Sequence, residues 1–285
     1  MLRRRIASAA VGAPLLLLAI WQGGAALWLL SVALAWLAGR EWLGLIGKPV
    51  AAPAQGLFYL GLFLLIGVGA LPAETSTAGP AAGFAGLLRD PLLAAGLVVV
   101  TVLSAWTIRL LLYPAALRLP GGAGGIIFGL AYVGLPLVHW PALRNFGEGL
   151  PGVWAAGPVL WVLAVVWAND MAAYGAGTVW GRHRLAPYLS PRKSVEGAAA
   201  GLFAAVTVAW LLHGWAGLPQ TTAAGSGALV ALAGQLGDLW ESALKRGAGV
   251  KDSGALIPGH GGVLDRFDAI IFALPVAHYL LLWSR

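Results

Sequence analysis

The sequence predicts an all-α, polytopic integral membrane protein of about nine transmembrane helices with a cytoplasmic N-terminus, and three observations support this fold class. The chain of 285 residues is 59% hydrophobic and 10% charged, with a mean hydropathy of +0.82. Its apolar stretches are continuous and rich in Ala and Leu, whereas the strands of a membrane barrel alternate between lipid-facing and interior residues. Its basic residues gather at alternate ends of these stretches. Soluble domains carry roughly 25% charged residues and disordered chains are poor in apolar ones, so both classes are excluded.

The predicted helices are the apolar runs whose length approaches the roughly 20 residues needed to cross a bilayer core. They occupy residues 6–22, 24–39, 55–72, 91–113, 123–140, 153–181, 197–216, 223–245 and 266–284. The first run follows the segment MLRRR, so a cleaved signal peptide is an alternative to a retained helix. We expect a retained helix, because every later run is itself a membrane span.

The basic residues predict the orientation. With the N-terminus inside, 14 of the 18 Lys and Arg residues fall at cytoplasmic helix ends, three fall outside, and Arg109 lies within the fourth run. This bias favours a cytoplasmic N-terminus and, for an odd number of helices, an external C-terminus. The net charge of +7 is therefore an orientation signal, and we expect no nucleic-acid partner. The chain has no cysteine, which excludes disulfides, thiolate nucleophiles and cysteine-bound zinc.

Carboxylates concentrate in the C-terminal part of the chain, on the predicted cytoplasmic side. Seven of the eleven acidic residues lie there, namely Asp170, Glu196, Asp238, Glu241, Asp252, Asp265 and Asp268. Ionisable groups in or beside a membrane are costly and usually mark function. We therefore divide the chain into a scaffold of transmembrane helices, residues 1–150, and a catalytic transmembrane region, residues 151–285.

Two polar segments precede the main acidic cluster. Asn169 and Asp170 lie inside the sixth apolar run, where they either line a polar cavity or form a hydrogen-bonded pair that packs helices together. The loop 190–197 contains Ser190, Lys193 and Ser194. Ser194 either caps the following helix, with the cations as topology anchors, or belongs to a phosphate site at that helix N-terminus.

The third segment, residues 237–268, is the most informative. Asp238, Glu241 and Lys245 share one helix face, and Asp265 and Asp268 repeat the i, i+3 spacing at the start of the last helix. The glycine-rich loop between them lets backbone N–H groups approach an anion. Clustered carboxylates without thiolates suit Mg²⁺. The pattern favours a metal-bridged polyphosphate and hence a phosphate-handling membrane enzyme; an ion-coupled transporter and a structural protein are the alternatives.

A family resemblance rests on this same segment. Residues 242–268 match the signature of the phosphatidate cytidylyltransferase (CDP-diacylglycerol synthase) family at every fixed position, from Ser242 and Lys245-Arg246 to the final Asp268. The resemblance extends to 234–239, to the Ser190–Ser194 loop and to Asn169-Asp170; Arg40-Glu41-Trp42 and 132–136 are similar but not diagnostic. Met171 departs from the family's usual small hydroxyl residue, and Arg192 and Ser194 replace the commoner Lys and Thr.

The resemblance implies an Mg²⁺-dependent nucleotidyltransferase of phospholipid biosynthesis. CTP and phosphatidic acid would give CDP-diacylglycerol and pyrophosphate. The family is a multi-helix membrane fold, commonly dimeric, so residues 1–150 are also expected to provide lipid access and homodimer contacts. We expect the protein in a bacterial inner membrane among membrane lipids, with its active site facing the cytoplasm.

The predicted site residues follow from the signature and the polar segments. The catalytic set is Asp238, Lys245, Arg246, Lys251, Asp252, His260, Asp265, Arg266 and Asp268. The substrate-binding set is Asn169, Asp170, Ser190, Lys193, Ser194, Ser242, Gly259, Gly261 and Gly262. The metal ligands are Asp238, Glu241, Asp265 and Asp268, with Asp170 and Asn169 lining the cavity and available to a second cation. His260 either contacts the leaving pyrophosphate or orders its loop.

The residue chemistry alone is also compatible with other functions. A membrane lipid kinase or a cytidylyltransferase for another lipid phosphate would share the polyphosphate site, although the full signature argues against both. An anion transporter would need a path across the bilayer, with inverted repeats, whereas the cluster lies at one face. The DGxxAR motif of CDP-alcohol phosphotransferases is missing from the sequence.

Overall fold

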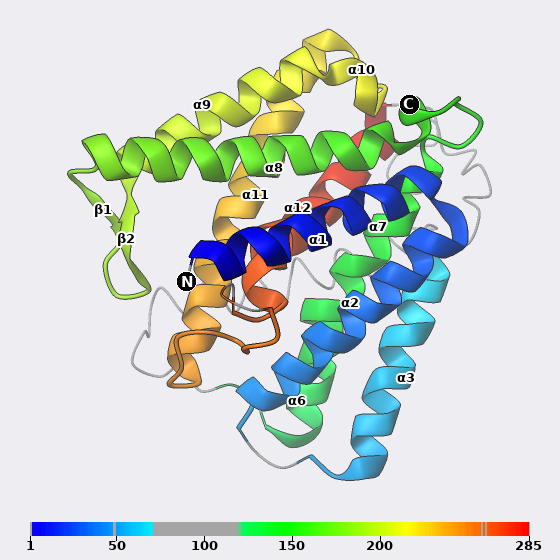
Figure 1. Cartoon of the computed structure of the whole chain (residues 1–285), viewed down its shortest axis with the longest axis vertical. Helices are drawn as coiled ribbons and strands as arrows, with labels where there is room; N and C mark the ends of the chain where they lie inside the picture. Colours follow the sequence, from blue (N-terminus) through cyan, green and yellow to red (C-terminus); the bar gives the residue numbers. More distant parts are fainter. Residues whose placement is uncertain are drawn as a thin grey trace.

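The computed structural model describes residues 2–47, 50–70, 119, 121–257, 259 and 261–284. In this part of the chain the regular secondary structure is helical except for one short hairpin and an isolated bridge (Figure 1). The N-terminal helices are α1 (Leu2–Gln22), α2 (Gly24–Leu45), α3 (Ala52–Gly69), α6 (Gly122–Gly129), the π-helix η3 (Leu130–Gly134) and α7 (Leu135–Asn145). The later elements are α8 (Val153–Trp180), β1 (Arg184–Ala186), β2 (Ser190–Ser194), α9 (Val195–Leu211), α10 (His213–Ala216), α11 (Gln220–Gly247) and α12 (Leu264–Ser284).

The predicted apolar runs are helical wherever the structure describes them, and the run 91–113 lies outside the described residues. Within the described residues, five helical stretches are long and apolar enough to cross a membrane: α2, α3, the continuous segment 122–145, residues 154–180 of α8, and α12. The described apolar part of α1 and the whole of α9 are shorter. These findings support a helical integral membrane protein; the number nine and the orientation remain predictions.

Some boundaries differ from the prediction. Helix α2 continues to Leu45, six residues past the expected end, so Arg40 and Glu41 belong to the helix and not to a loop. Glu41 is nonetheless buried, which is tolerated because its carboxylate accepts hydrogen bonds from the far end of the chain. The segment 184–194, expected as a loop, forms the antiparallel pair β1–β2, in which Arg184 faces Ser194.

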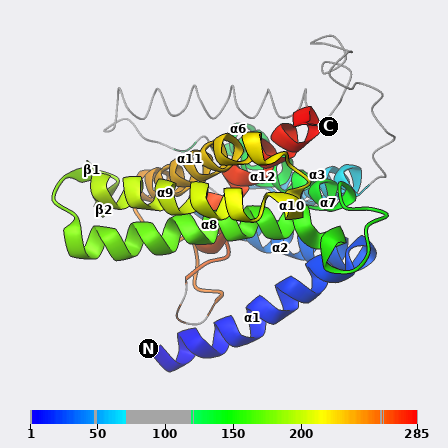
Figure 2. The ribbon, with the colours of Figure 1, turned by 90° about the horizontal axis from the view of Figure 1, so that it is seen from above.

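The C-terminal helices form one packed group. Helix α8 packs on α9, α9 on α11, and α11 on α12, and the view from above shows them side by side (Figure 2). Small residues allow these close approaches: a side chain at Gly227 would overlap Ala209, and one at Gly237 would overlap the backbone of Asp268. Small-residue contacts of this kind are how helices associate in a membrane.

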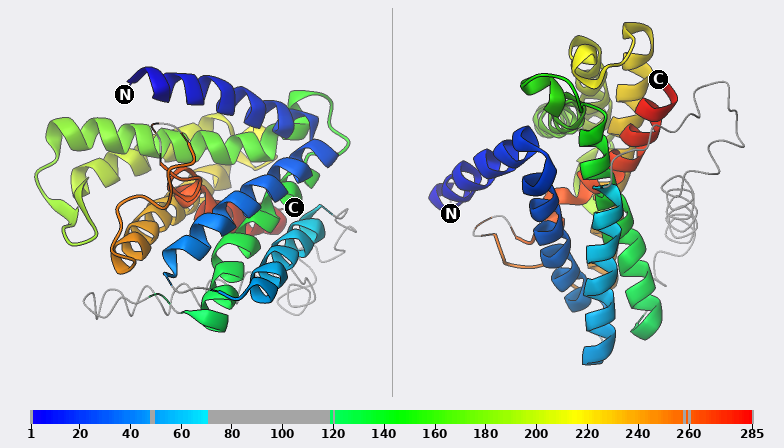
Figure 3. Two further views of the ribbon diagram at one scale, coloured as in Figure 1. Left: turned by 60° about the horizontal axis from the view of Figure 1, so that its bottom comes forward. Right: turned by 90° about the vertical axis from the view of Figure 1, so that its right-hand side faces the viewer.

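Helices α2, α3 and α6–α7 form a second group, seen beside the C-terminal helices in Figure 3. A row of aromatic rings connects the two groups and begins at Trp42 of α2, whose indole N–H donates to the Gly125 carbonyl of α6 at 2.9 Å and whose ring stacks on Phe128 of α6. Phe128 stacks in turn on Trp240 of α11, with ring centroids 5.5 Å apart. Aromatic stacking therefore links the end of α2 to α11 through Phe128 of α6.

The π-helix η3 lies directly before Pro136. The Leu135 N–H donates to the Leu130 carbonyl, five residues back. Pro136 has no N–H to give to the carbonyl of Tyr132, so the helix cannot keep its regular pattern through this turn. The widened turn places Tyr132 against the rings of Trp42 and Trp240.

Candidate active site

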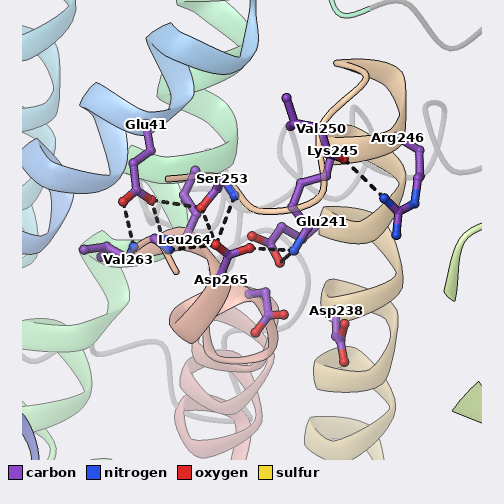
Figure 4. Close-up of polar contacts among 12 residues, drawn as sticks. Glu41, Asp238, Glu241, Lys245, Arg246, Val250, Ser253, Val263, Leu264 and Asp265 are labelled. Carbon is purple, nitrogen blue, oxygen red and sulfur yellow. Dashed lines mark hydrogen bonds and ion pairs between the residues drawn. The ribbon is translucent and has the colours of Figure 1, made fainter. Parts of the chain in front are cut away.

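The predicted cluster forms where α11 ends, α12 begins and the C-terminal end of α2 meets them (Figure 4). Lys245 lies at its centre: its Nζ is 2.9 Å from Glu241 Oε2 and 2.6 Å from Asp265 Oδ1. The side chains of Glu241 and Asp265 are 1% and 5% exposed, so both charges are out of water. The predicted i, i+4 pairing of Glu241 with Lys245 is confirmed, and Asp265 joins it from the next helix.

Asp265 also organises the loop that joins α11 to α12. Its Oδ2 accepts hydrogen bonds from the backbone N–H and hydroxyl of Ser253, both at 3.0 Å, and from the Gly262 N–H at 2.8 Å. Two glycines let the loop backbone approach Asp265 closely enough for these hydrogen bonds. Gly261 has a φ of +89°, which other residues rarely adopt, and a side chain at Gly262 would overlap the Ser253 hydroxyl.

Glu41 is a site residue that sequence reasoning missed. Its Oε1 accepts the Val263 N–H at 2.8 Å, and its Oε2 accepts the Leu264 N–H at 2.9 Å and faces the Ser253 hydroxyl at 3.0 Å. The signal available in the sequence was a carboxylate at the end of an apolar run, which by itself suggests function. Its partners are more than 200 residues away, so no local spacing could reveal them.

A second acidic group lies beside the first on α11. Asp238 pairs with Lys193 of β2 at 2.6 Å, and the Asp238 side chain is 37% exposed. Asp170 of α8 and Asp268 of α12 lie close enough to interact electrostatically with Asp238. Predicted residues from four elements, α8, β2, α11 and α12, therefore lie in one region, and Asp238 lies about one turn before Glu241 on α11.

The residues fit a divalent cation by their chemistry. Glu241 Oε1 is buried without a hydrogen-bond donor, and Asp268 is a like charge nearby. A buried carboxylate in this situation needs a cation or a proton. Among the described residues, no three His, Asp or Glu side chains already converge on a common point. Mg²⁺ keeps several waters and takes only one or two carboxylates in many sites, so a preformed cage is not required.

The remaining signature residues lie around this core. Arg246 is exposed and donates to the Val250 carbonyl at 3.3 Å, holding the start of the loop. Lys251 and Asp252 are exposed on the loop, Arg266 is exposed in the first turn of α12, Ser242 is half-buried on α11, and Gly259 is exposed. His260 lies outside the described residues, so the two roles expected for it stay predictions.

Asn169 is buried and Asp170 is exposed on the neighbouring position of α8. The Asn169 amide donates to Asp170 Oδ1 at 3.1 Å, and its own oxygen accepts from Gln235 of α11 at 2.8 Å. Gln235 also donates to the Ala198 carbonyl of α9. The expected hydrogen-bonded pair of Asn169 and Asp170 is therefore present, and Gln235 joins it to α11. The substrate-binding role of the two residues stays a prediction. Met171 is 70% exposed.

Ser194 caps α9. Its buried hydroxyl accepts the Gly197 N–H at 3.1 Å, as the capping alternative predicted. Ser190 is half-buried at the other end of β2.

Glu196, in the first turn of α9, accepts hydrogen bonds from the backbone and ring of His183. Hydrogen bonds from its own backbone and from His183 lower the pKa of Glu196 to about 2, so this carboxylate stays ionised near neutral pH.

The fold and the site together define an integral membrane protein in which most of the described carboxylates and lysines lie at one end of the helices. The chain belongs to the cytidylyltransferase family, whose model matches residues 3–283. This match confirms the family predicted from the signature at 242–268.

Several similar proteins are bacterial phosphatidate cytidylyltransferases. The protein of Staphylococcus aureus (strain COL) is 40% identical over 160 residues, which cover 55% of this chain and 58% of the relative. The proteins of Staphylococcus haemolyticus (strain JCSC1435) and Staphylococcus epidermidis (strain ATCC 12228 / FDA PCI 1200) are 38% and 37% identical over 164 and 158 residues, with the same shares covered. The chain thus spans less than two-thirds of the length of the curated relatives it matches.

Proposed function

We propose that the protein is a CTP:phosphatidate cytidylyltransferase, which makes CDP-diacylglycerol and pyrophosphate for phospholipid biosynthesis. The observation that carries the proposal is the buried Glu241–Lys245–Asp265 network, in which Lys245 and Asp265 are signature residues of a chain that belongs to the cytidylyltransferase family. The names of the similar staphylococcal proteins support the lipid substrate.

The proposed reaction is an in-line phosphoryl substitution. A phosphate oxygen of phosphatidic acid attacks the α-phosphorus of CTP, a new P–O bond forms, and the bond to the β-phosphate oxygen breaks to release pyrophosphate. Phosphatidic acid arrives ionised, so no strong general base is required. The chemical problem is to bring two anions together, and the exposed cations Arg246, Lys251 and Arg266 around the site meet that requirement.

The carboxylates serve the proposed reaction as cation ligands. Asp238, Glu241 and Asp268 would hold Mg²⁺, with Asp170 available to a second cation, and a bound Mg²⁺ would neutralise part of the triphosphate charge. Asp265 can join them only through Oδ1, which accepts a hydrogen bond from Lys245 alone, because Oδ2 already accepts three. Its main part in the mechanism is to hold Lys245 and the loop in place.

We place the protein as a homodimer in the inner membrane of a bacterium, with this site facing the cytoplasm, where CTP is made. The excess of basic residues at the corresponding helix ends supports the orientation, and the bacterial relatives support the membrane.

The test is product identification with purified protein in detergent micelles containing phosphatidic acid, CTP and Mg²⁺. We expect CDP-diacylglycerol and pyrophosphate in equal amounts by mass spectrometry. Asp238→Asn should lower the rate at least tenfold, whereas Glu148→Gln, at an exposed loop position, should leave it unchanged. Release of a nucleoside diphosphate would indicate a lipid kinase, and anion flux into proteoliposomes without any product would indicate a transporter. Either result would overturn the proposal.

A further inference from the structure

Glu41 occupies an unusual position for a carboxylate. It lies in α2, a helix long and apolar enough to span the membrane, and it is 8% exposed. A buried charge at such a position is costly unless strong hydrogen bonds compensate it. Figure 4 shows the carboxylate pointing from α2 into the turn that begins α12.

The sequence at the start of α12 explains why a distant acid is needed there. Val263 accepts the first helical hydrogen bond, from the Phe267 N–H, and so occupies the N-cap. Valine cannot cap a helix, because it has no side-chain acceptor. Glu41 accepts the N–H groups of Val263 and Leu264 instead, from 222 and 223 residues away. A carboxylate at a helix N-terminus is also favoured by the helix dipole.

Glu41 is linked to the proposed catalytic core through one hydroxyl. The Ser253 Oγ lies 3.0 Å from Glu41 Oε2 and 3.0 Å from Asp265 Oδ2. Asp265 in turn holds Lys245 at 2.6 Å. The route from Glu41 to Lys245 therefore passes through Ser253 and Asp265. The Ser253 hydroxyl has one proton and donates to one of the two carboxylates at a time, while the Ser253 backbone N–H also donates to Asp265 Oδ2 at 3.0 Å.

The glycines around the network leave room for Glu41 specifically. A side chain at Gly254 would lie 2.7 Å from Glu41 Oε1. A side chain at Gly262 would overlap both Glu41 Oε2 and the Ser253 hydroxyl. Two loop glycines thus border the carboxylate of a helix that is remote in sequence.

We propose that Glu41 is a positioning residue for the cytidylyl transfer: it fixes the loop and the first turn of α12, and through Ser253 it sets the position of Asp265 and Lys245. This inference rests on the proposed function. It assigns the N-terminal helices a part in the chemistry, since α2 carries a group on which the geometry of the C-terminal site depends.

The first test is Glu41→Gln, compared with Glu148→Gln as the same change at an exposed position. Glutamine keeps one acceptor oxygen but turns an NH₂ group toward a backbone N–H, so at least one charge-assisted hydrogen bond is lost. We expect kcat per folded molecule to fall about tenfold or more at saturating substrates, with the folded amount measured by size-exclusion chromatography. Unchanged kcat per folded molecule, with only less folded protein, would show a purely structural role and overturn the proposal.

Ser253→Ala gives a second variant that removes only the shared hydroxyl and leaves the buried carboxylate in place. It should lower kcat in the same direction, and the double variant should lose less than the product of the two single losses, because both act along one route. Independent, multiplicative losses would overturn the route through Ser253.

Limited trypsin digestion separates this proposal from the proposed function. Lys251 is exposed on the loop, and we expect Glu41→Gln to speed cleavage after Lys251 severalfold while Glu148→Gln does not. This measurement needs no catalytic activity. An inactive wild-type protein would defeat the proposed function alone, whereas unchanged cleavage in Glu41→Gln would defeat the positioning role alone.

Discussion

Lys245 lies between two carboxylates that have almost no contact with water. Its single positive charge compensates both of them where α11 meets α12. Glu241 has one oxygen on Lys245 and the other without a donor. Asp265 has a cradle of three further hydrogen bonds. Loss of the lysine would therefore affect Glu241 more than Asp265, because only Asp265 keeps other donors.

We predict that Lys245→Met lowers the free energy of unfolding by about 3–5 kcal/mol, the usual effect of leaving a buried charge without its partner. Thermal unfolding in detergent measures the change. Lys245→Met combined with Glu241→Gln should recover part of the stability, since it removes the carboxylate left without compensation. Lys251→Met, at an exposed loop position, should change stability by no more than about 0.5 kcal/mol. Equal effects of the two single changes would contradict this account.

Gly262 provides a separate check on the loop. We predict that Gly262→Ala destabilises the protein by about 1–3 kcal/mol and lowers activity, because its side chain would overlap the Ser253 hydroxyl and Glu41. Gly225→Ala is the matched control: this exposed helical glycine of α11 has open space where the new atom would lie. The control should be neutral or stabilising by up to about 1 kcal/mol. A harmless Gly262→Ala would mean that the loop can relax away from Glu41.

Among the helices, α11 illustrates what the sequence could predict. The sequence predicted a membrane span over residues 223–245, but α11 is not among the helices long and apolar enough to cross a membrane. The spacing of Glu241 and Lys245 along it, in contrast, predicted a shared face that the structure confirms. Apolar runs likewise predicted α2, α3, α8 and α12, because a helix in lipid must satisfy its backbone internally and the signal is continuous.

Elements made by long-range contacts could not be predicted in this way. The hairpin β1–β2 contains few residues and no alternating apolar pattern, so its pairing of Arg184 with Ser194 left no periodic signal. The contacts of Glu41 at the site could not be predicted for the same reason. The sequence shows a carboxylate at this position, but its partners Val263 and Leu264 depend on how α2 packs against the start of α12.

The junction of β2 and α9 gives a prediction for Ser194. Ser194→Ala removes the acceptor for the Gly197 N–H and should cost about 0.5–2 kcal/mol of stability. If capping is the whole role of Ser194, KM for CTP and for phosphatidic acid will stay at the wild-type values in the folded enzyme. A rise in either KM beyond about threefold would instead support the substrate-binding role that the sequence also suggested.

Helix α8 sets the arrangement of the whole molecule across the membrane. Its 28 residues extend about 42 Å at ~1.5 Å per residue, more than the roughly 30 Å of a bilayer core. Figure 1 shows the loop after α7 at one end of α8 and the hairpin β1–β2 at the other. If α8 spans the membrane, these two segments lie on opposite sides, and the basic residues around the hairpin predict that it lies inside.

The chain contains no cysteine, so a single introduced thiol can be labelled without background from the rest of the chain and the label read on the purified protein. Tyr188→Cys lies on the hairpin, where the native side chain is 86% exposed, and Glu148→Cys lies at the exposed loop after α7. With a membrane-impermeant maleimide, we expect Glu148→Cys to react in intact cells and Tyr188→Cys to react only after permeabilisation. The reverse pattern would invert the orientation and place the site outside, away from CTP. Reaction of both variants in intact cells would show that α8 does not cross the membrane. The predicted position of the site at the cytoplasmic membrane surface would then be wrong.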